Sequence, residues 1–321
     1  MADRIGVIGA GAFGTALAVA QAAPAREIVL WARDRAAAAA MAERRENTAR
    51  LPGVALPAGV VPTAEFDAAL ADVLLLAVPT QSLRGLLAAH ADALRGRMLV
   101  ACCKGVELGT GRLPSEVIAE VVPEARAAVL TGPSFAADIA LGKPTALTLA
   151  MSGPGGEALQ AALSTRSLRL YLSDDLIGAQ LGGALKNVVA IAAGITMGAG
   201  LGESARAALM TRGFAEMTRF AEGRGAESET LHGLSGLGDL VLTCTSEKSR
   251  NYRHGLALGA GRPPEEGKTV EGVATARALA AAASADMLPV TAMVAALLDG
   301  RVTLAEAVEL LLSRPLKRER G

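Results

Sequence analysis

A segment of 27 residues, from Leu176 to Gly202, contains a single charged residue, Lys186. A run of this length and apolar character either crosses a bilayer or forms an interior helix of a helical domain. The segment contains seven glycines and has Lys186 and Asn187 near its middle, and a lysine in the middle of a membrane span is costly to insert. We therefore expect an interior helix that ends near the glycines at 194–202, and no stable membrane insertion.

The surroundings of Lys186 restrict what its amine can do. An ammonium group among apolar residues must find a counter-ion, reach water along its own stem, or lose its proton. Burial lowers the pKa of a lysine, which makes the amine a usable proton donor or acceptor near neutral pH. The alternative is a surface lysine whose stem lies along the helix, and this segment alone leaves both interpretations open.

The first half of the chain alternates short apolar runs with helical segments. Continuous apolar runs of this kind are typical of a parallel sheet that is covered by helices on both faces. Helices are expected at 11–23, after Asp34, and at 80–93. Strands are expected at 4–9, 27–31, 72–79, 97–103, 127–132, 145–151 and 168–172.

After Asp174 the strand-like runs stop, and Ala, Leu, Gly and Met recur at helical spacing. Helices are expected at 203–223, 272–285, 291–298 and 303–312, the last capped by Thr303. The predicted fold is an α/β Rossmann-type dinucleotide-binding domain at residues 1–173, followed by an all-α substrate and catalytic domain at 174–321. The short basic tail at 314–321 is expected to be a solvated end.

A glycine-rich loop opens the chain. Gly9, Gly11 and Gly14 fit the pattern G-x-G-x-x-G between a predicted strand and a predicted helix. Glycines at these positions permit the tight turn and let the backbone approach a pyrophosphate at the helix N-terminus. The strand–loop–helix context therefore predicts a dinucleotide site.

The end of the second strand indicates which dinucleotide fits. An acidic residue there would bind the ribose 2′-hydroxyl of NAD. Here Arg33 lies about twenty residues after the glycine loop, where a guanidinium could bind the 2′-phosphate of NADP. The alternative is that Asp34 binds the ribose and Arg33 is a surface residue. We expect NADP or NAD, with NADP favoured.

Polar residues follow two further strands and gather again in the second domain. Lys104 follows the strand at 97–103, and the segment 131–136 follows the next, at the sheet edge where α/β proteins bind ligands. The segment 232–251 combines Asp239 with an arginine, an amide and hydroxyls, which can bind a phosphate dianion. The alternative there is a capped turn between helices. His232 and His254 are weaker candidates for a base, because neither has an evident orienting carboxylate.

Composition excludes several classes of function. Lys plus Arg and Asp plus Glu balance at 32 each, so no global field favours nucleic acid or a membrane surface. Three cysteines, an odd number, suit neither a disulfide framework nor a metal site, and no signal peptide precedes them. We expect a cytoplasmic protein without a bound metal.

With these residues assembled, the chain resembles the bacterial NAD(P)-dependent glycerol-3-phosphate dehydrogenases along nearly its whole length. Blocks such as GGALKN and GLGDLVLTC, with SRN after them, are far more specific than the glycine loop. The matching blocks are Ile8-GAGAFGTAL, Cys103-KGVE, Thr131-GPSFA, Leu181-GGALKNVVAIAAGI, Ala207-ALMTRG, Gly236-LGDLVLTCTS, Ser249-RN and Thr269-VEGV.

The resemblance implies an active site between the two domains, with dihydroxyacetone phosphate and sn-glycerol 3-phosphate as substrates and a role in glycerophospholipid synthesis. Lys186 then resembles the proton acceptor in alcohol oxidation and the donor in ketone reduction. The implied substrate-binding residues are Lys104, Gly132, Ser134, Lys186, Asp239, Ser249, Arg250 and Asn251. The implied cofactor-binding residues, beside the loop glycines, are Ala12, Phe13, Arg33, Lys104, Ala136, Arg250, Val270 and Glu271.

The chain departs from the family pattern at a few positions. Ala12 and Phe13 stand where the family often has a hydroxyl or amide residue followed by tryptophan, and Arg50 replaces a frequent aromatic. Met197 and Ser204 also differ. These changes bear on cofactor affinity rather than on the reaction.

The expected reaction is hydride transfer between the nicotinamide and the substrate carbonyl carbon, with Lys186 and Asp239 handling the proton. Two alternatives stay open. A β-hydroxyacid or 6-phosphogluconate-type dehydrogenase would act on carboxylates, and a dinucleotide-binding sensor would bind the cofactor without turnover. The direction of the reaction, the cofactor preference and feedback inhibition stay open as well. The small-residue helices could pack within one subunit or across a homodimer.

Overall fold

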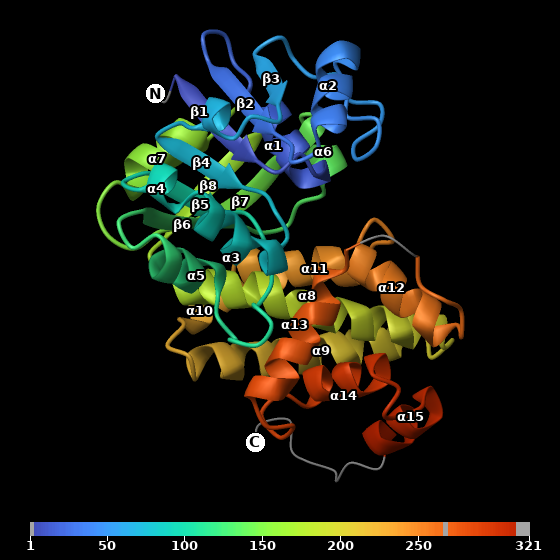
Figure 1. Ribbon diagram of the computed structural model, residues 1–321. Coiled ribbons are helices and arrows are strands. Elements are labelled where there is room, and N and C mark those ends of the chain that lie inside the picture. The colour runs from blue at the N-terminus through green and yellow to red at the C-terminus, as the bar shows by residue number, and fades with distance from the viewer. Residues whose placement is uncertain (1–2, 266–268, 313–321) are drawn as a thin grey trace.

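The computed structural model describes residues 3–265 and 269–312, which form two lobes (Figure 1). The first lobe is built on one eight-stranded sheet in the order β3-β2-β1-β4-β5-β6-β7-β8. This is the predicted Rossmann-type domain. Its strands are β1 (Arg4–Ile8), β2 (Glu27–Trp31), β3 (Val60–Thr63), β4 (Val73–Leu76), β5 (Met98–Ala101), β6 (Arg126–Thr131), β7 (Thr145–Ala150) and β8 (Leu168–Ser173).

Both faces of the sheet are covered, which explains why its strands read as continuous apolar runs. In β4, Val73 and Leu75 point to one core, while Leu74 and Leu76 point to the other. The first face is covered by α1 (Ala12–Gln21), α2 (Arg35–Arg44) and α7 (Gly156–Leu163). The second is covered by α3 (Thr80–Ala89), α4 (Ala91–Leu94), α5 (Pro114–Val121) and the first turn of the long helix that follows β8.

The sheet differs from the prediction in two ways: strand β7 runs antiparallel to its neighbour β6, and one strand, β3, was not predicted. The prediction of a parallel sheet is right for β1 to β6 but wrong at β7, which pairs antiparallel with β6. The connection holds only a short helix, α6 (Ala136–Ala140), which packs beside α1 instead of crossing a face of the sheet. Strand β3 was not predicted, because its run is short and contains Pro62, a residue tolerated there since β3 is an edge strand.

The helix expected at 80–93 is divided into α3 and α4 at His90, whose backbone leaves the helical region. The ring of His90 stacks on Phe66, with the two ring centroids 3.5 Å apart. The helix expected at 11–23 is α1, and the helix expected after Asp34 is α2, which begins at Arg35, whereas α5, α6 and α7 were not predicted.

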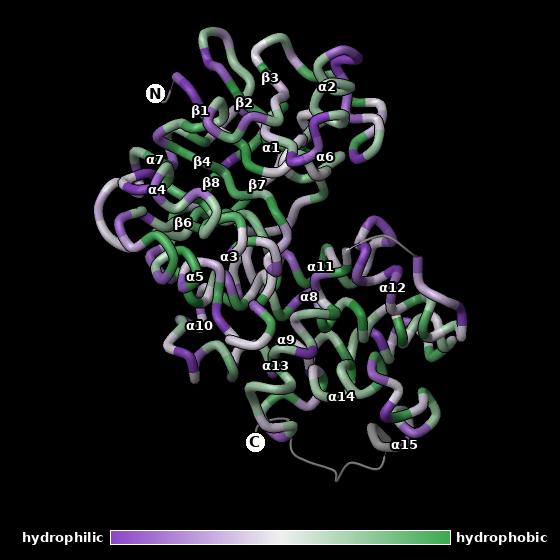
Figure 2. The backbone as a smooth tube through the Cα atoms, in the orientation of Figure 1, coloured by the Kyte–Doolittle hydropathy of each residue, from purple (hydrophilic) through white to green (hydrophobic). Residues whose placement is uncertain are grey.

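The second lobe is helical and surrounds α8 (Leu176–Gly198). Among the described residues, α8 is the one helix long and apolar enough to cross a bilayer, but 89% of its most apolar window is buried inside the protein. In Figure 2 it is an apolar segment enclosed by the other helices. The expected interior helix is confirmed.

The helices that surround α8 come after it in the chain. Thr303 caps the last of the described helices by accepting from the backbone N–H of Glu306, as predicted. The change from strands to helices between Ser173 and Leu176 supports the proposed domain boundary at 173/174. The predicted basic tail at 314–321 lies outside the described residues. The elements are α9 (Glu203–Glu222), α10 (Ser228–His232), the π-helical turn η2 (Leu234–Gly238), α11 (Asp239–Cys244), α12 (Arg250–Gly259), α13 (Glu271–Ala282), α14 (Pro289–Leu298) and α15 (Leu304–Leu312).

Helices α8 and α12 cross with their backbones in contact, because each presents two glycines four residues apart. A Cβ on Gly194 would lie 2.1 Å from the carbonyl O of Tyr252, and one on Gly198 would lie 2.2 Å from that of Leu256. On the facing helix, Gly255 and Gly259 leave equally little room. Small residues therefore bring α12, and the polar residues at its start, against the middle of α8.

We expect Gly255→Ala to destabilise the protein, since its Cβ would meet the carbonyl O of Ile191 at 2.0 Å and force the two helices apart. The free energy of unfolding should fall by about 1–3 kcal/mol, measured by urea denaturation. The matched control is Gly85→Ala in the exposed middle of α3, where a Cβ meets nothing within 4 Å. That substitution should be neutral or stabilise by up to about 1 kcal/mol. Equal effects of the two substitutions would contradict the close crossing.

Candidate active site

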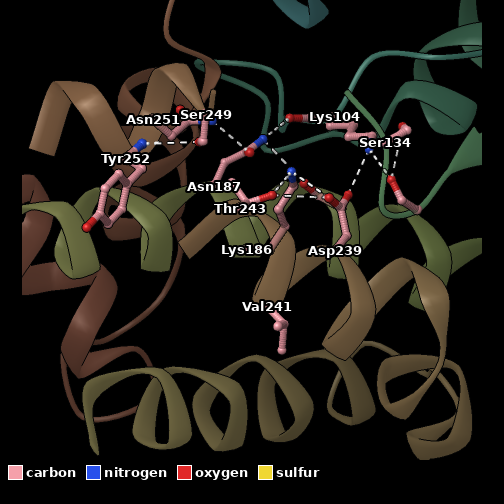
Figure 3. A network of polar contacts seen from close by, with 12 residues as sticks. Lys104, Ser134, Lys186, Asn187, Asp239, Val241, Thr243, Ser249, Asn251 and Tyr252 are labelled. Atoms are coloured by element: carbon pink, nitrogen blue, oxygen red, sulfur yellow. Dashed lines mark hydrogen bonds and ion pairs between the residues drawn. The ribbon is translucent and has the colours of Figure 1, made fainter. Parts of the chain in front are cut away.

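Lys186 lies in the middle of α8 with its side chain only 8% exposed. Its Nζ donates to Oγ1 of Thr243 at 2.7 Å and lies 2.9 Å from Oδ1 of Asp239 (Figure 3). The amine therefore points into the protein, toward α11, and does not reach the surface along its stem. The surface interpretation of Lys186 is wrong.

Asp239 joins the two lobes through its two carboxylate oxygens. The side chain is 1% exposed, and its Oδ2 lies 2.7 Å from Nζ of Lys104, which follows β5 at the edge of the sheet. The same ammonium group donates to the carbonyl O of Gly132 at 2.8 Å, just after β6. One buried carboxylate thus bridges a lysine of the helical lobe and a lysine of the sheet lobe, and the structure brings four predicted site residues together.

The neighbouring charges in this cluster shift the pKa values of Lys186 and Asp239. Burial lowers the pKa of Lys186; the neighbouring Asp239 opposes this, and the positive charge of Lys104 adds to it. Burial alone would raise the pKa of Asp239, but Lys104 and then Lys186 hold that pKa below its ordinary value. Asp239 therefore stays ionised near neutral pH, while Lys186 is moved toward the range in which a lysine can exchange its proton.

Two side-chain amides, the buried Asn187 and the partly exposed Asn251, continue the network away from Lys186. Asn187 donates to the carbonyl O of Lys104 at 3.0 Å and accepts from Nδ2 of Asn251 at 2.8 Å. The Oδ1 of Asn251 in turn accepts from the backbone N–H of Gly272 at 3.0 Å. These bonds fix the start of α12 and the start of α13 to the middle of α8 and to the Lys104 loop.

Asn187 and Thr243 join the predicted residues in this network, although neither was predicted individually as a site residue. Asn187 adjoins Lys186, and Thr243 lies one helical turn after Asp239, so its hydroxyl projects from the same side of α11. Thr243 both accepts from Lys186 and donates to Oδ1 of Asp239, at 3.1 Å. The i, i+4 spacing from Asp239 is the signal that could have identified it.

The remaining predicted substrate residues lie at the rim of this network. Ser249 caps α12, its Oγ accepting from the backbone N–H of Tyr252 at 3.2 Å. Ser134 donates to the carbonyl O of Gly132 at 3.3 Å, beside the Lys104 contact. Arg250 is exposed. A small pocket is lined by Arg250, Arg253, His254, Glu265 and Val270.

The glycine loop has the geometry that a dinucleotide requires. Gly9 has a φ of +114°, in the region that favours glycine, and a Cβ on Gly14 would lie 2.0 Å from the carbonyl O of Gly9. Gly11 caps α1 without any side chain, and a Cβ there would meet nothing within 4 Å. The open backbone at a helix N-terminus suits a pyrophosphate. Ala12 and Phe13 begin α1, and Ala136 packs beside them at the start of α6.

Arg33 and Asp34 follow β2 and are both exposed. The Oδ1 of Asp34 accepts from the backbone N–H groups of Ala36 and Ala37, at 2.8 and 3.1 Å, and so caps α2. Glu271, the first residue of α13, accepts from the backbone N–H of Thr80 at 3.3 Å, at the start of α3. Burial raises the pKa of the Glu271 carboxyl.

The hydrogen-bond partner and the counter-ion of Lys186 are Thr243 and Asp239 rather than a histidine or a cysteine, although Cys244 faces the amine. His232 is exposed, with its Nδ1 2.9 Å from the carbonyl O of Ser228. His254 lies in the small pocket, where burial lowers its pKa. All three cysteines are free and buried, and burial raises the pKa of Cys103 and of Cys244 to about 12. Thiols of this kind are unreactive.

Comparison with known proteins relates the whole chain to one enzyme family. A model described as "NAD-dependent glycerol-3-phosphate dehydrogenase N-terminus" matches residues 4–155, and its C-terminal counterpart matches residues 175–309. A glycerol-3-phosphate dehydrogenase [NAD(P)+] of Cereibacter sphaeroides is 60% identical over 98% of this chain and 100% of the relative. That of Roseobacter denitrificans is 57% identical over 98% and 99%. The crystal structure of the Coxiella burnetii glycerol-3-phosphate dehydrogenase superposes with a TM-score of 0.91 at 35% identity, covering 97% of this chain and 99% of that one.

The lowered pKa of Lys186 predicts how stability depends on pH. Between the folded pKa and the ordinary value of about 10.4, the unfolded chain holds a proton that the folded protein has lost. The free energy of unfolding should therefore rise with pH in this interval, by up to about 1.4 kcal/mol per pH unit from this group. We expect that rise in the unmodified protein and its absence in Lys186→Met, compared by urea denaturation across the interval. Parallel pH dependences of the two proteins would contradict it.

Proposed function

The chain belongs to the NAD-dependent glycerol-3-phosphate dehydrogenase family, and on that basis we propose that it interconverts dihydroxyacetone phosphate and sn-glycerol 3-phosphate with NADP or NAD. The observation that carries the proposal is the buried Lys186–Asp239–Lys104 cluster, where the sheet edge meets the helical lobe. A buried amine with a lowered pKa is suited to donate or accept a proton, which a ketone reductase needs.

The residues around the glycine loop fit a dinucleotide. Gly9, Gly11 and Gly14 would hold its pyrophosphate at the start of α1, and Arg33 would contact the adenosine ribose or its 2′-phosphate. Val270 and Glu271, which lie at the start of α13, would contact it from the helical lobe. When bound, the nicotinamide supplies or takes up the hydride that the protein side chains cannot provide.

Lys186 would move the proton of the reaction. In ketone reduction its ammonium group donates a proton from Nζ to the substrate oxygen, and in alcohol oxidation the neutral amine accepts that proton. Asp239 stays ionised in both steps and stabilises the ammonium form of Lys186. Lys104 adds positive charge close to the oxygen that becomes negative, where such charge is most effective in a dry site.

The start of α12 would hold the substrate phosphate. Ser249, Arg250 and Asn251 lie at the N-terminus of a ten-residue helix, where backbone N–H groups and the helix dipole favour an anion. The Asn187–Asn251 bond sets the position of this helix start relative to the Lys186 amine. Ser134 and Gly132 would contact the substrate from the sheet lobe.

The wider setting is a proposal on the same basis. We expect a small phosphorylated substrate, a location in the cytoplasm and a contribution to glycerophospholipid synthesis. The three free cysteines support a reducing compartment. We also propose that the chain can form a homodimer.

The assay of this proposal follows the oxidation of NADPH and of NADH with dihydroxyacetone phosphate. We expect Lys186→Ala to lower turnover at least about a hundredfold, the usual size of a lost general acid–base group. Arg277→Ala, at a surface ion pair of α13, is the control and should leave turnover unchanged. Turnover of hydroxyacids in place of the phosphorylated ketone would favour the hydroxyacid alternative. Binding of NADPH with no turnover of any of these substrates would favour the sensor.

Cofactor preference rests on Arg33. We expect Arg33→Ala to raise the KM for NADPH about tenfold or more and to leave the KM for NADH within about twofold, because the charge-assisted hydrogen bonds to a 2′-phosphate are lost. The matched control is Arg35→Ala, an exposed arginine two residues away that pairs with Glu65. If both variants change the two KM values equally, Arg33 does not recognise the phosphate.

A further inference from the structure

The loop that carries Lys104 belongs to the sheet lobe by sequence but packs into the helical lobe. It follows β5, which ends at Ala101. Val106 and Leu113 are each 1% exposed and lie in the core around α8, together with residues of α8 and α9. The carbonyl O of Lys104 itself accepts from Asn187 of α8. The position of this loop therefore decides where the Lys104 ammonium lies between the lobes.

One face of α3 holds the loop through two side chains that lie one helical turn apart. Gln81 donates to the carbonyl O of Val106 at 2.8 Å and accepts from the backbone N–H of Leu108 at 2.9 Å. Arg84 makes a two-pronged pair with Glu107, from Nε to Oε1 at 2.9 Å and from Nη2 to Oε2 at 3.0 Å. Both partners are thus fixed in direction as well as in distance.

The Glu107 carboxylate is largely removed from water. Its side chain is 9% exposed, and Thr110 donates to its Oε2 at 2.5 Å. The hydrogen bond from Arg84 holds the pKa of Glu107 below its ordinary value despite this burial. The other charged groups here are Glu120 of α5, which also binds Arg84, and Arg112. Arg84 keeps a third of its side chain exposed, so the pair is partly screened by water, but its two parallel hydrogen bonds make it stronger than an ordinary surface pair.

Gly105 shows how little freedom the loop has next to Lys104. A Cβ at this position would lie 2.8 Å from Oγ1 of Thr80 and 3.2 Å from Oγ1 of Thr275. Thr80 begins α3 in the sheet lobe, and Thr275 lies in α13 of the helical lobe. The backbone beside Lys104 is therefore enclosed by both lobes.

We propose that Arg84 and Glu107 are positioning residues for Lys104: with Gln81 they fix the loop so that the Lys104 ammonium reaches Asp239 and the substrate. The proposal rests on the function proposed above. Neither residue lies among those that contact Lys186 or Asp239, so they act through Lys104 alone.

Loss of the contacts of Gln81, Arg84 and Glu107 with the loop should change the pKa of Lys186. The titratable groups that face Lys186 or Lys104 are Asp239, Cys244, Glu271 and Cys102. The charge of Lys104 lowers the pKa of Lys186, so a loop that lets Lys104 move away raises that pKa. Reduction needs the ammonium form and oxidation the neutral amine. The pH at which each rate is half-maximal should therefore move upward in both directions.

The test compares Arg84→Gln, Glu107→Gln, the double variant and Gln81→Ala in the full-length enzyme. Each should raise the KM for dihydroxyacetone phosphate at least about threefold and move both pH profiles of kcat to higher pH. The double variant should be no worse than the worse single variant, because the two side chains act as one unit. Arg95→Gln, which removes surface pairs with Asp92 and Glu124, should match the unmodified enzyme.

Folded variants with unchanged KM values and unchanged pH profiles would overturn the proposal, even if their Tm is lowered. Gln81→Ala decides the matter should Arg84→Gln or Glu107→Gln fail to fold, because it loosens the same loop without leaving a charge unpaired. An unmodified protein that does not reduce dihydroxyacetone phosphate would refute the function itself. If the unmodified protein is active and the variants keep its KM values and pH profiles, only the positioning role is refuted.

Discussion

The sharing of one carboxylate by two ammonium groups is the interaction on which the rest of the structure depends. Each buried ion costs several kcal/mol to remove from water, so Lys186 can occupy the middle of an apolar helix only because Asp239 faces it. Lys104 comes to the same carboxylate from the other lobe. The ion pairs that compensate these buried charges are therefore also contacts that join the two lobes. Two cations against one anion leave a positive surplus, which favours a phosphorylated substrate and a developing oxyanion.

Glycines of α8 make this geometry sterically accessible. A Cβ on Gly183 would lie 2.6 Å from Oγ1 of Thr131, at the end of β6, and one on Gly182 would lie 2.7 Å from the carbonyl O of Ser235. The end of the sheet and the turn before α11 can thus approach the helix on either side of Lys186. Further along, Gly194 and Gly198 admit α12. The same glycines that counted against a membrane span in the sequence let the neighbouring elements bring polar groups close to this helix.

The sequence predicts what depends on local pattern and fails where tertiary contacts decide. The apolar runs located seven of the eight strands, but the antiparallel direction of β7 depends on where α6 packs, which no run of residues encodes. The burial of Lys186 stayed ambiguous because its counter-ion is 53 positions away in the chain. Asn187 was missed for a related reason, since its partners Lys104 and Asn251 come from two other elements. The cofactor loop was predictable because its residues are contiguous.

The hydrogen-bond partners of Lys186 explain how its amine can change protonation state without a rearrangement of the neighbouring side chains. An ammonium group has three donors, of which one binds Thr243 and one faces Asp239. Among the described residues, no third acceptor is hydrogen-bonded to Nζ, and in the proposed function the substrate oxygen would take that third position. After proton transfer the neutral amine retains two N–H donors for the same two partners, and its lone pair takes the third position. Thr243 and Asp239 thus orient the amine in both states, and in the proposed function the proton would move along a direction that the protein has already set.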